Sequence, residues 1–595
     1  MVKAKFLPFL IATTALAAPA FAGSDNAAAS NAVPADLITG IEAPVPATPA
    51  IQVPAIRNDD DFALVFTAIQ QQRWAEAQAM LANAPAGPLA NMARAELYLA
   101  AGSPRVELGP LLSLINTAPY LPQAEQLSRL AQKRGAQFLP DTPQVRRLAY
   151  LGSSPRRADP SEVSDAAATA TRNAIVDRIK ADDPAGAETA LLAGLDGLSP
   201  SALTEMQQRV AWGYYIENDD ANARRMAEVA STGTGEWAPQ ADWVRGLSSW
   251  RMKNYADAAQ AFDRVGKFAA NEETRAAGFY WSARASVAAR RPGEAQPRLQ
   301  TAAQYGETFY GILAQEQLGM TRAAPKNRGQ AVSGRIASNA NVRIATALAS
   351  FGESGLADQV LRHEAKIGGD EERADLLALA HQLSLPSTQL YLAHYGPSGS
   401  SANPFDRYPA PKWAPKEGWR VDPWLVFAHT LQESRFQADA VSPADARGLM
   451  QVRPGTAADM ARARGSYFSA ADLKRPEVNL EYGQSYLEQL RDMDQTEGLL
   501  PKVIAAFNAG PSPVGRWKYD VRDQGDPLLF IESIPYWETR AYVGIILRNY
   551  WMYQTMAGEE SKSLEGLSQN AWPRFPGMSG PAWVRKNDSR AMAQR

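Results

Sequence analysis

The feature that most constrains the fold is a series of paired helical patterns that runs from about residue 58 to 370. The stretch DDDFALVFTAIQQQRWAEAQAMLANAP predicts two short antiparallel helices, and WVRGLSSWRMKNYADAAQAFDRV predicts a second pair. A third stretch, AAGFYWSARASVAARRPGEAQPRLQTAAQYG, repeats the plan of a long helix, a short turn and a helix. Because one pair cannot bury its apolar face alone, such pairs stack side by side, and the pattern predicts an α-solenoid.

The second pair carries small residues where close helix packing requires them. Gly246, Tyr255, Ala258 and Phe262 fall at offsets that resemble those of tetratricopeptide-type repeats. Small residues let two helices approach, and we expect Phe262 to fill the gap between them. The repeats are degenerate, so the pattern predicts the class of fold but no repeat number.

The composition argues against several kinds of chemistry. The chain has no cysteine, which excludes thiolate nucleophiles, disulfides and cysteine-ligated metals. None of its 4 histidines belongs to an HExxH or similar ligand pair, so we expect no metal site. The formal net charge is -2 and no basic block stands out in the body of the chain, which argues against nucleic acid as a partner. Catalysis would then rest on carboxylates and hydroxyls.

The two ends of the chain predict export and a tail. Residues 1–22 have the features of a cleavable signal peptide, with a positive start, an apolar run and the small-residue site Ala20-Phe21-Ala22. The apolar run is too short to span a bilayer, and no cysteine follows it for a lipid anchor. We therefore expect a soluble periplasmic protein without a membrane anchor. Residues 557–595 are polar and rich in proline and glycine, and they predict a mobile tail.

At 595 residues the chain is too long for one core, and its composition divides it further. Residues 23–57 are rich in alanine and proline and predict an extended linker. Residues 58–395 form the predicted superhelical region, whose last part is expected to be a linker domain. A Gly/Ser/Pro-rich connector at 396–416 leads into residues 405–556, where helical segments alternate with polar, glycine-containing loops.

The helix predicted to begin at Asp422 and Pro423 carries the best candidate for a catalytic group. Asp is a favoured N-cap and Pro a favoured first residue, and the residues that follow are largely apolar, which predicts a buried helix. Glu433 lies about three turns into it. Burial and the negative end of the helix dipole both disfavour its charged form, so we expect the raised pKa that a general acid needs. Position alone is more typical of a glutamate on the solvated surface.

The segments after this helix supply motifs in a fixed order. Glu433-Ser434 is followed by GLMQ, N-x-x-x-G-x-x-Y-L, AFNAG and E-S-I-P-x-x-E-T-R-x-Y motifs, which occupy Gly448–Gln451, Asn479–Leu487, Ala506–Gly510 and Glu532–Tyr542. Together, over residues 405–555, they resemble the catalytic domain of soluble lytic murein transglycosylases. The upstream stretches FYWSAR and TFYGILA resemble the helical region of the same enzymes.

The resemblance implies an all-α protein in which a tetratricopeptide-like superhelix precedes a lysozyme-like catalytic domain with a sugar-binding cleft. It also implies cleavage of peptidoglycan between N-acetylmuramic acid and N-acetylglucosamine, with 1,6-anhydromuramic acid ends as product and no cofactor. Glu433 would act first as acid and then as base. The partners implied are peptidoglycan glycan strands, and the helical repeats leave room for other cell-wall proteins.

The same resemblance assigns further site residues. Ser442 lies in the loop expected near Glu433 and the substrate, and Glu538 is expected to bind substrate or to shape the cleft. Gln451 and Asn508 are expected to hydrogen-bond the sugars, with turn formation as the alternative role of Asn508. Gly448 is expected there for backbone geometry. The substrate-binding positions are Ser442, Gly448, Met450, Gln451, Phe507, Asn508 and Glu538.

Three further residues are expected to lie near Glu433. Phe507 replaces a tyrosine of the family and removes a hydroxyl close to the expected site. Arg453 stands where the family often has methionine, and it could pair with Glu433 and lower its pKa or could point to solvent. His429 lies one helical turn before Glu433 and could tune the carboxylate, although a packing role is more typical of such a residue.

Two alternative functions stay open. A hydrolytic muramidase would need a second carboxylate opposite Glu433, and Asp439, Asp445 and Glu538 are the candidates. A catalytically weak scaffold would hold peptidoglycan and recruit partners through its repeats. The intact Glu433-Ser434 pair argues against the scaffold.

Overall fold

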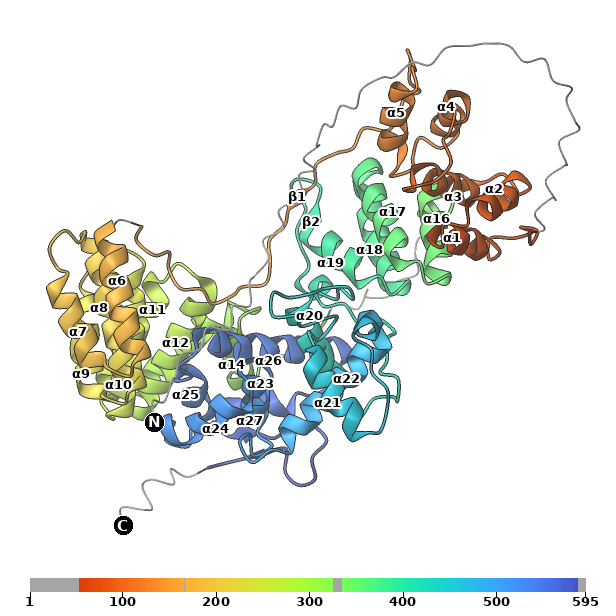
Figure 1. The fold of residues 1–595 in the computed structure, drawn as a ribbon. Helices are drawn as coiled ribbons and strands as arrows, with labels where there is room; N and C mark the ends of the chain where they lie inside the picture. The colour runs from red at the N-terminus through yellow and green to blue at the C-terminus, as the bar shows by residue number, and fades with distance from the viewer. Residues whose placement is uncertain (1–52, 165, 325–333, 587–595) are drawn as a thin grey trace, which may run out of the picture. The chain divides into compact units, whose positions relative to one another are not determined.

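The regular secondary structure of the described part is almost entirely helical, as predicted (Figure 1). The computed structural model describes residues 53–164, 166–324 and 334–586. Within these ranges the strands form two antiparallel pairs, β1 Ala149–Tyr150 with β2 Tyr395–Gly396 and β3 Trp572–Pro573 with β4 Trp583–Val584. The predicted signal peptide and nearly all of the predicted linker lie outside the described residues. Among the described residues, no helix combines the length and the apolar character that crossing a bilayer requires.

The helices belong to two compact units, of which the smaller combines two separate parts of the chain. Its helix α16 packs against both α3 and α17. The side-chain amide of Asn341, buried on α16, donates to the Tyr120 carbonyl at 2.9 Å and to Glu364 Oε2 at 2.7 Å, which joins the two parts. The helices of this unit are α1 Phe62–Gln70, α2 Trp74–Ala82, α3 Pro88–Leu99, α4 Leu108–Thr117, α5 Ala124–Lys133, α15 Gly334–Ala337, α16 Ala340–Ser350, α17 Ser354–Ile367 and η2 Asp370–Glu372.

The larger unit contains a stack of consecutive helices, in which each helix from α8 to α12 packs against the next. Gly246 of α10 must be small, because an added Cβ would lie 2.5 Å from the ring of Phe262 on α11. Phe262 is fully buried and fills the gap between the two helices, as the sequence predicted. The helices of the stack are α6 Ala166–Lys180, α7 Pro184–Ala193, α8 Pro200–Ile216, α9 Asp220–Ser231, α10 Trp237–Arg251, α11 Tyr255–Phe268, α12 Glu272–Ala288, η1 Pro292–Glu294, α13 Ala295–Ala303 and α14 Phe309–Gln317.

The same unit contains the helices that carry the sequence motifs. Helix α26 is central among them, because α20, α23 and α25 all pack against it, as does α14 of the stack. The predicted boundary between residues 395 and 405 therefore falls inside one compact unit. The remaining helices of the unit are α18 Arg373–Gln382, α19 Pro386–His394, η3 Pro404–Arg407, α20 Pro423–Glu433, α21 Pro454–Ala463, η4 Ala470–Lys474, α22 Pro476–Arg491, α23 Leu500–Ala509, α24 Pro511–Asp520, α25 Pro527–Glu532, α26 Trp537–Ala557 and α27 Lys562–Ser568.

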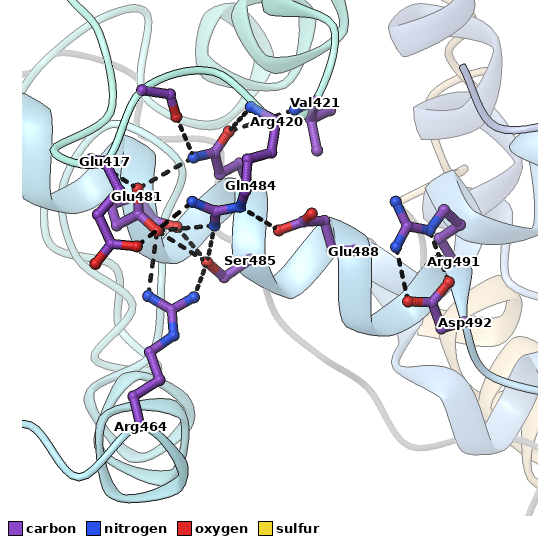
Figure 2. A network of polar contacts seen from close by, with 11 residues as sticks. Glu417, Arg420, Val421, Arg464, Glu481, Gln484, Ser485, Glu488, Arg491 and Asp492 are labelled. Carbon is purple, nitrogen blue, oxygen red and sulfur yellow. Dashed lines mark hydrogen bonds and ion pairs between the residues drawn. The ribbon is translucent and has the colours of Figure 1, made fainter. Parts of the chain in front are cut away.

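A polar network holds the segment that leads into α20 against α22 (Figure 2). Glu481, buried on α22, accepts from the guanidinium groups of Arg420 at 2.8 Å and Arg464 at 3.1 Å. Gln484, one turn along α22, accepts from the backbone N–H of Arg420 at 3.0 Å and donates to the Gly418 carbonyl at 2.9 Å. Burial opposes ionisation of Glu481, yet the bonds from Arg420 hold its pKa below the usual value. The network is therefore charged at neutral pH and fixes the start of α20.

One expectation for the superhelical region was wrong, because the chain between α5 and α6 is not helical. Apart from β1, residues 136–164 are extended or form bends. The segment contains 4 prolines, each of which lacks an N–H and disfavours helix in the residue before it. Part of the segment lies against the motif-bearing helices: the Pro155 carbonyl accepts from Arg548, and Arg157 pairs with Glu532 at 2.6 Å.

The predicted mobile tail beyond residue 557 was also wrong for residues 558–586. Helix α27 packs against α14 and β3, and β3 pairs with β4. Trp572 is fully buried, and its indole N–H donates to the Gly525 carbonyl at 2.8 Å. The polar average of the segment concealed a few large apolar side chains that suffice to anchor it. These side chains are Leu564, Leu567, Trp572 and Phe575.

Candidate active site

Helix α20 begins where its sequence predicted. The carboxylate of Asp422 caps it by accepting a backbone N–H at 2.9 Å, and Pro423 is its first residue. The helix ends at Glu433, with Ser434 as its C-cap. The Ser434 hydroxyl donates to the Leu449 carbonyl at 2.8 Å. Glu433 is therefore held at the negative end of a buried helix, beside the loop that carries the GLMQ motif.

Tyr542 of α26 is the hydrogen-bond partner of Glu433. Its hydroxyl donates to Glu433 Oε1 over 2.5 Å and lies 2.8 Å from His429 Nδ1. Tyr542 and His429 are buried, and Glu433 is partly buried. Because α20 and α26 pack together, the three groups form a chain that runs from one helix to the other and back. This chain fixes the direction in which the carboxyl group of Glu433 points.

Burial determines the protonation states along this chain. Burial raises the pKa of Glu433 to about 7, and the hydrogen bond from Tyr542 opposes the rise. Burial also lowers the pKa of His429 to about 3, so its imidazole is neutral at neutral pH. A carboxyl group that is half protonated near pH 7 can give a proton and take one back, which general acid–base catalysis requires.

The imidazole of His429 has a defined tautomer. Because the Tyr542 hydroxyl donates its proton to Glu433, its oxygen accepts from Nδ1–H of His429. Nε2 then carries a lone pair, and it is buried without a hydrogen-bond partner among the described residues. The sequence left open whether His429 tunes the carboxylate or packs in the core. The structure places it in contact with Tyr542 rather than with Glu433.

The GLMQ loop is held in shape by Asn479 of α22. The side-chain amide of Asn479 donates to the carbonyls of Arg447 and Leu473, each at 2.8 Å. Its oxygen accepts from the N–H of Met450 at 2.8 Å, and Met450 is fully buried. Gly448 has φ of +72°, and an added Cβ would lie 2.2 Å from both Asn479 Nδ2 and the Leu473 carbonyl. Backbone geometry therefore accounts for the glycine at 448.

Gln451 and Ser442 lie on the same loop, and both are partly buried. Gln451 Nε2 donates to the Gly448 carbonyl at 2.9 Å and to the Ala440 carbonyl at 3.3 Å. The Ser442 hydroxyl accepts from the N–H of Ala446 at 3.0 Å. These contacts stabilise the loop. They leave the side-chain oxygen of Gln451 without a hydrogen bond to any described residue.

Phe507 and Asn508 lie at the end of α23, which packs against α26. Phe507 contacts the rings of His429 and Tyr486, with centroids 4.5 and 5.5 Å away. The Asn508 side-chain oxygen accepts from the Thr539 hydroxyl at 2.6 Å. Phe507 thus packs against the ring of His429, and the hydroxyl that contacts Glu433 belongs to Tyr542 of α26.

The other charged candidates do not set the pKa of Glu433. Arg453 is exposed at the N-cap of α21. Asp439 and Asp445 are exposed, and Asp445 forms an ion pair within its own loop at 2.8 Å. Glu538 is partly buried in the first turn of α26, and burial raises its pKa. The pKa of Glu433 reflects burial and Tyr542, with no contribution from these four charges.

Comparison with known proteins identifies the part of the chain that contains Glu433. Residues 413–530 match the family model described as the transglycosylase SLT domain. This segment belongs to the transglycosylase SLT domain family. The match confirms the resemblance inferred from the motifs. The SLT domain segment contains Glu433 and Asn508, whereas Glu538 and Tyr542 follow it.

Relatives of the SLT domain agree with this match. The soluble lytic murein transglycosylase of Escherichia coli (strain K12) is 32% identical over 172 residues, which are 29% of this chain and 25% of that protein. The enzyme of the same description from Salmonella typhimurium is 33% identical over 151 residues, 25% of this chain and 23% of that protein. The matches thus span about a quarter of these relatives. The crystal structure of the 70 kDa soluble lytic transglycosylase of Escherichia coli aligns at 17% identity with a TM-score of 0.47, over 87% of this chain and 99% of that one.

Sequence reasoning missed Tyr542 as the partner of Glu433, and Thr539 as the partner of Asn508. Both tyrosine and threonine belong to the E-S-I-P-x-x-E-T-R-x-Y motif, which drew attention for its glutamates. A signal was present, because Glu538 and Tyr542 are four residues apart and share one face of a helix. Glu532, the first glutamate of the motif, is buried and has other partners than Glu433 has. It accepts hydrogen bonds from Tyr310 and Arg157, both at 2.6 Å.

Proposed function

We propose that this protein is a lytic murein transglycosylase that cleaves the β-1,4 bond between N-acetylmuramic acid and N-acetylglucosamine and leaves 1,6-anhydromuramic acid ends. The observation that carries the proposal is the carboxyl group of Glu433, which Tyr542 orients and burial holds near a pKa of about 7. The SLT domain match to residues 413–530 supports the same activity.

In the first step Glu433 acts as a general acid. Its carboxyl proton passes to the glycosidic oxygen as the bond to the anomeric carbon of muramic acid breaks. The N-acetyl group of the same sugar assists as positive charge develops at that carbon. Glu433 becomes a carboxylate, which the Tyr542 hydroxyl stabilises by its short hydrogen bond.

In the second step the Glu433 carboxylate acts as a base. It takes the proton of the C6 hydroxyl of the same muramic acid, and O6 bonds to the anomeric carbon to close the 1,6-anhydro ring. The carboxyl group regains its proton, so the cycle consumes no water. An intramolecular hydroxyl has an entropic advantage over a water molecule as nucleophile.

A single carboxylate distinguishes this course from hydrolysis. Retaining and inverting glycosidases place a second carboxylate within about 5 to 9.5 Å of the first. A charge so close would raise the pKa of Glu433, yet the rise comes from burial. The electrostatics of Glu433 therefore favour transglycosylation over a hydrolytic muramidase.

Two side-chain groups are positioned to bind the sugars. Among the described residues, Asn508 Nδ2 and Gln451 Oε1 have no hydrogen-bond partner, although the other end of each amide is held by Thr539 or by loop carbonyls. A fixed donor and a fixed acceptor suit the hydroxyl and N-acetyl groups of a glycan. We assign substrate contacts to these two groups, and a shaping role to Gly448 and Met450.

The proposal extends to location and partners. The signal peptide predicted at residues 1–22 supports export to the periplasm, where peptidoglycan is found. Glycan strands are then the principal partner.

Mass spectrometry of the soluble fragments released from purified peptidoglycan tests the function. The native protein should release fragments with anhydro ends, and Glu433→Gln should release none while keeping a cooperative unfolding transition. Release of reducing ends would show a hydrolase instead. No release from well-folded native protein would favour the scaffold.

A further inference from the structure

A cavity of about 250 Å³ lies between helices of the solenoid stack and the first turn of α26, within the larger unit. The stack contributes residues of α6, α8 and α10, and the extended segment before α6 contributes Arg157. Three indole rings and three guanidinium groups dominate its wall. These are Trp212, Trp237, Trp243, Arg157, Arg209 and Arg540.

Each of the three arginines lies over one of the three indoles. Arg540 is 4.1 Å from the ring centre of Trp212, and Arg157 is 4.4 Å from that of Trp243. Arg209 is 4.9 Å from the ring centre of Trp237. Cation–π contacts hold guanidinium groups in fixed places on the wall.

Arg540 differs from the other two in forming no ion pair with a described residue, although the charges of Glu532 and Asp159 favour its charged form. Arg157 is paired with Glu532 at 2.6 Å, and Arg209 with Glu205 at 2.9 Å. Among the described residues, the Arg540 side chain forms no ion pair and donates no hydrogen bond. Burial lowers its pKa to about 10, so it remains charged at neutral pH. A partly buried cation that forms no ion pair costs desolvation free energy, and a residue that breaks a packing rule in this way is a candidate for a functional site.

The surroundings of Arg540 favour an anion. Lys180 also lines the cavity, and Asp159 is the single carboxylate on the wall. Pro535 and Trp537 place the N-terminal end of the 21-residue helix α26 at the cavity edge, and no side chain caps that end. The positive end of the helix dipole adds to the charge of Arg540.

The shape and the aromatic lining define the ligand further. Guanidinium groups bind carboxylates through paired hydrogen bonds, and flat indoles offer an apolar surface to a sugar ring. A volume of 250 Å³ lies below that of drug-sized sites and suits one sugar unit rather than a strand. We propose that this cavity is a subsite for a carboxylate carried by one muramic acid unit, with the carboxylate on Arg540 and the sugar against Trp212.

The choice of muramic acid rests on the proposed function, but the site is separate from the chemistry at Glu433. Arg540 and Tyr542 are two residues apart on α26, so their side chains point to nearly opposite sides of the helix. The carboxylate could be the lactyl group of the sugar itself or belong to its stem peptide. Both sources present the same group to Arg540.

Calorimetry on the full chain tests the subsite. The Glu433→Gln variant is titrated with N-acetylmuramic acid, with N-acetylmuramoyl dipeptide and with uncharged N-acetylglucosamine, and the titrations are repeated after adding Arg540→Met. We expect Arg540→Met to weaken binding of one or both acids about tenfold or more, and to leave N-acetylglucosamine unchanged. The acid that loses more affinity identifies the source of the carboxylate. Unchanged affinity for both acids, or an equal loss for the uncharged sugar, would overturn the proposal.

Further measurements separate an effect on binding from an effect on folding. Arg462→Met removes an exposed arginine of α21 and should change no affinity. Because Arg540 forms no ion pair with a described residue, Arg540→Met should keep or raise the unfolding temperature. A clear fall with unchanged binding would assign Arg540 to the fold instead. Arg540→Lys keeps the charge and should retain part of the affinity for the acids. Arg540-dependent binding without release of anhydro fragments by the native protein would refute the proposed function and keep the subsite. Release of anhydro fragments without Arg540-dependent binding would refute the subsite and keep the proposed function.

Discussion

The hydroxyl of Tyr542 lies 2.5 Å from Oε1 of Glu433 and donates a hydrogen bond to it. This contact joins helices α20 and α26 through two residues that are 109 positions apart in the sequence. It gives the carboxyl group of Glu433 a fixed direction, and it opposes the rise in pKa that burial causes.

Removing the Tyr542 hydroxyl should slow the reaction and shift its pH dependence. Tyr542→Phe leaves the carboxylate of Glu433 without its donor, so we expect kcat to fall about 10- to 100-fold with little change in KM. The pKa of Glu433 should rise further, and the alkaline limb of the pH–rate profile should move to higher pH. Tyr550→Phe is the matched control, because Tyr550 of the same helix donates to Asp422 at the helix cap. Tyr550→Phe should lower the free energy of unfolding and leave the alkaline limb of the pH–rate profile unchanged.

His429 should act through Tyr542 alone. His429→Leu removes the Nδ1–H donor, and we expect kcat to fall a few-fold because the Tyr542 hydroxyl is less well oriented. The same substitution made in the Tyr542→Phe background should change kcat no further. Stability should hold or rise slightly, since the buried Nε2 has no partner to lose. An additive loss in the double variant would show that His429 reaches Glu433 by another route.

The raised pKa of Glu433 also predicts a pH-dependent effect on stability. Folding raises this pKa from 4.5 to about 7, so the folded state binds the proton more tightly than the unfolded state. The stabilisation of the folded state by this tighter proton binding is fully present below pH 4.5 and is lost as the pH rises through 7. Glu433→Gln cannot ionise, so at pH 8 it should exceed the native protein in free energy of unfolding by about 1 to 3 kcal/mol. Equal differences at pH 4 and pH 8 in thermal or urea unfolding would contradict the assignment.

The GLMQ loop should tolerate no side chain at residue 448. Gly448→Ala places a Cβ against Asn479 and the Leu473 carbonyl in a backbone conformation with φ of +72°, and we expect a loss of about 2 to 4 kcal/mol in the free energy of unfolding. Gly455→Ala on α21 is the control, since nothing lies within 4 Å of its added Cβ. Alanine is the better helix former, so this control should be neutral or slightly stabilising. Urea unfolding of both variants measures the difference.

The sequence predicted most of what is local in this protein. The helix pairs, the close approach of Gly246 to Phe262 and the start of α20 follow from periodicity, small residues and capping, which act over a few positions. The raised pKa of Glu433 also followed, because it depends on burial of one helix. The roles of Tyr542 and Arg540 did not, since each depends on which side chains from distant segments meet α26.

The segments predicted wrongly fail for a related reason. Residues 136–164 carry prolines that prevent helix, but they lie against other elements, as the pair of Arg157 and Glu532 shows. Residues 558–586 look polar on average, but Trp572 finds a buried place that only the assembled fold provides. The composition of a segment describes that segment alone. Whether the segment takes up an ordered structure depends also on the surface that other segments offer it.

The most direct test of the central claim is cleavage of purified peptidoglycan in water enriched in ¹⁸O, followed by mass spectrometry of the released fragments. If Glu433 directs the C6 hydroxyl to the anomeric carbon, the new muramic acid ends are anhydro rings that contain no ¹⁸O. One ¹⁸O atom at each new end would show that water is the nucleophile, and the single-carboxylate account would then be wrong.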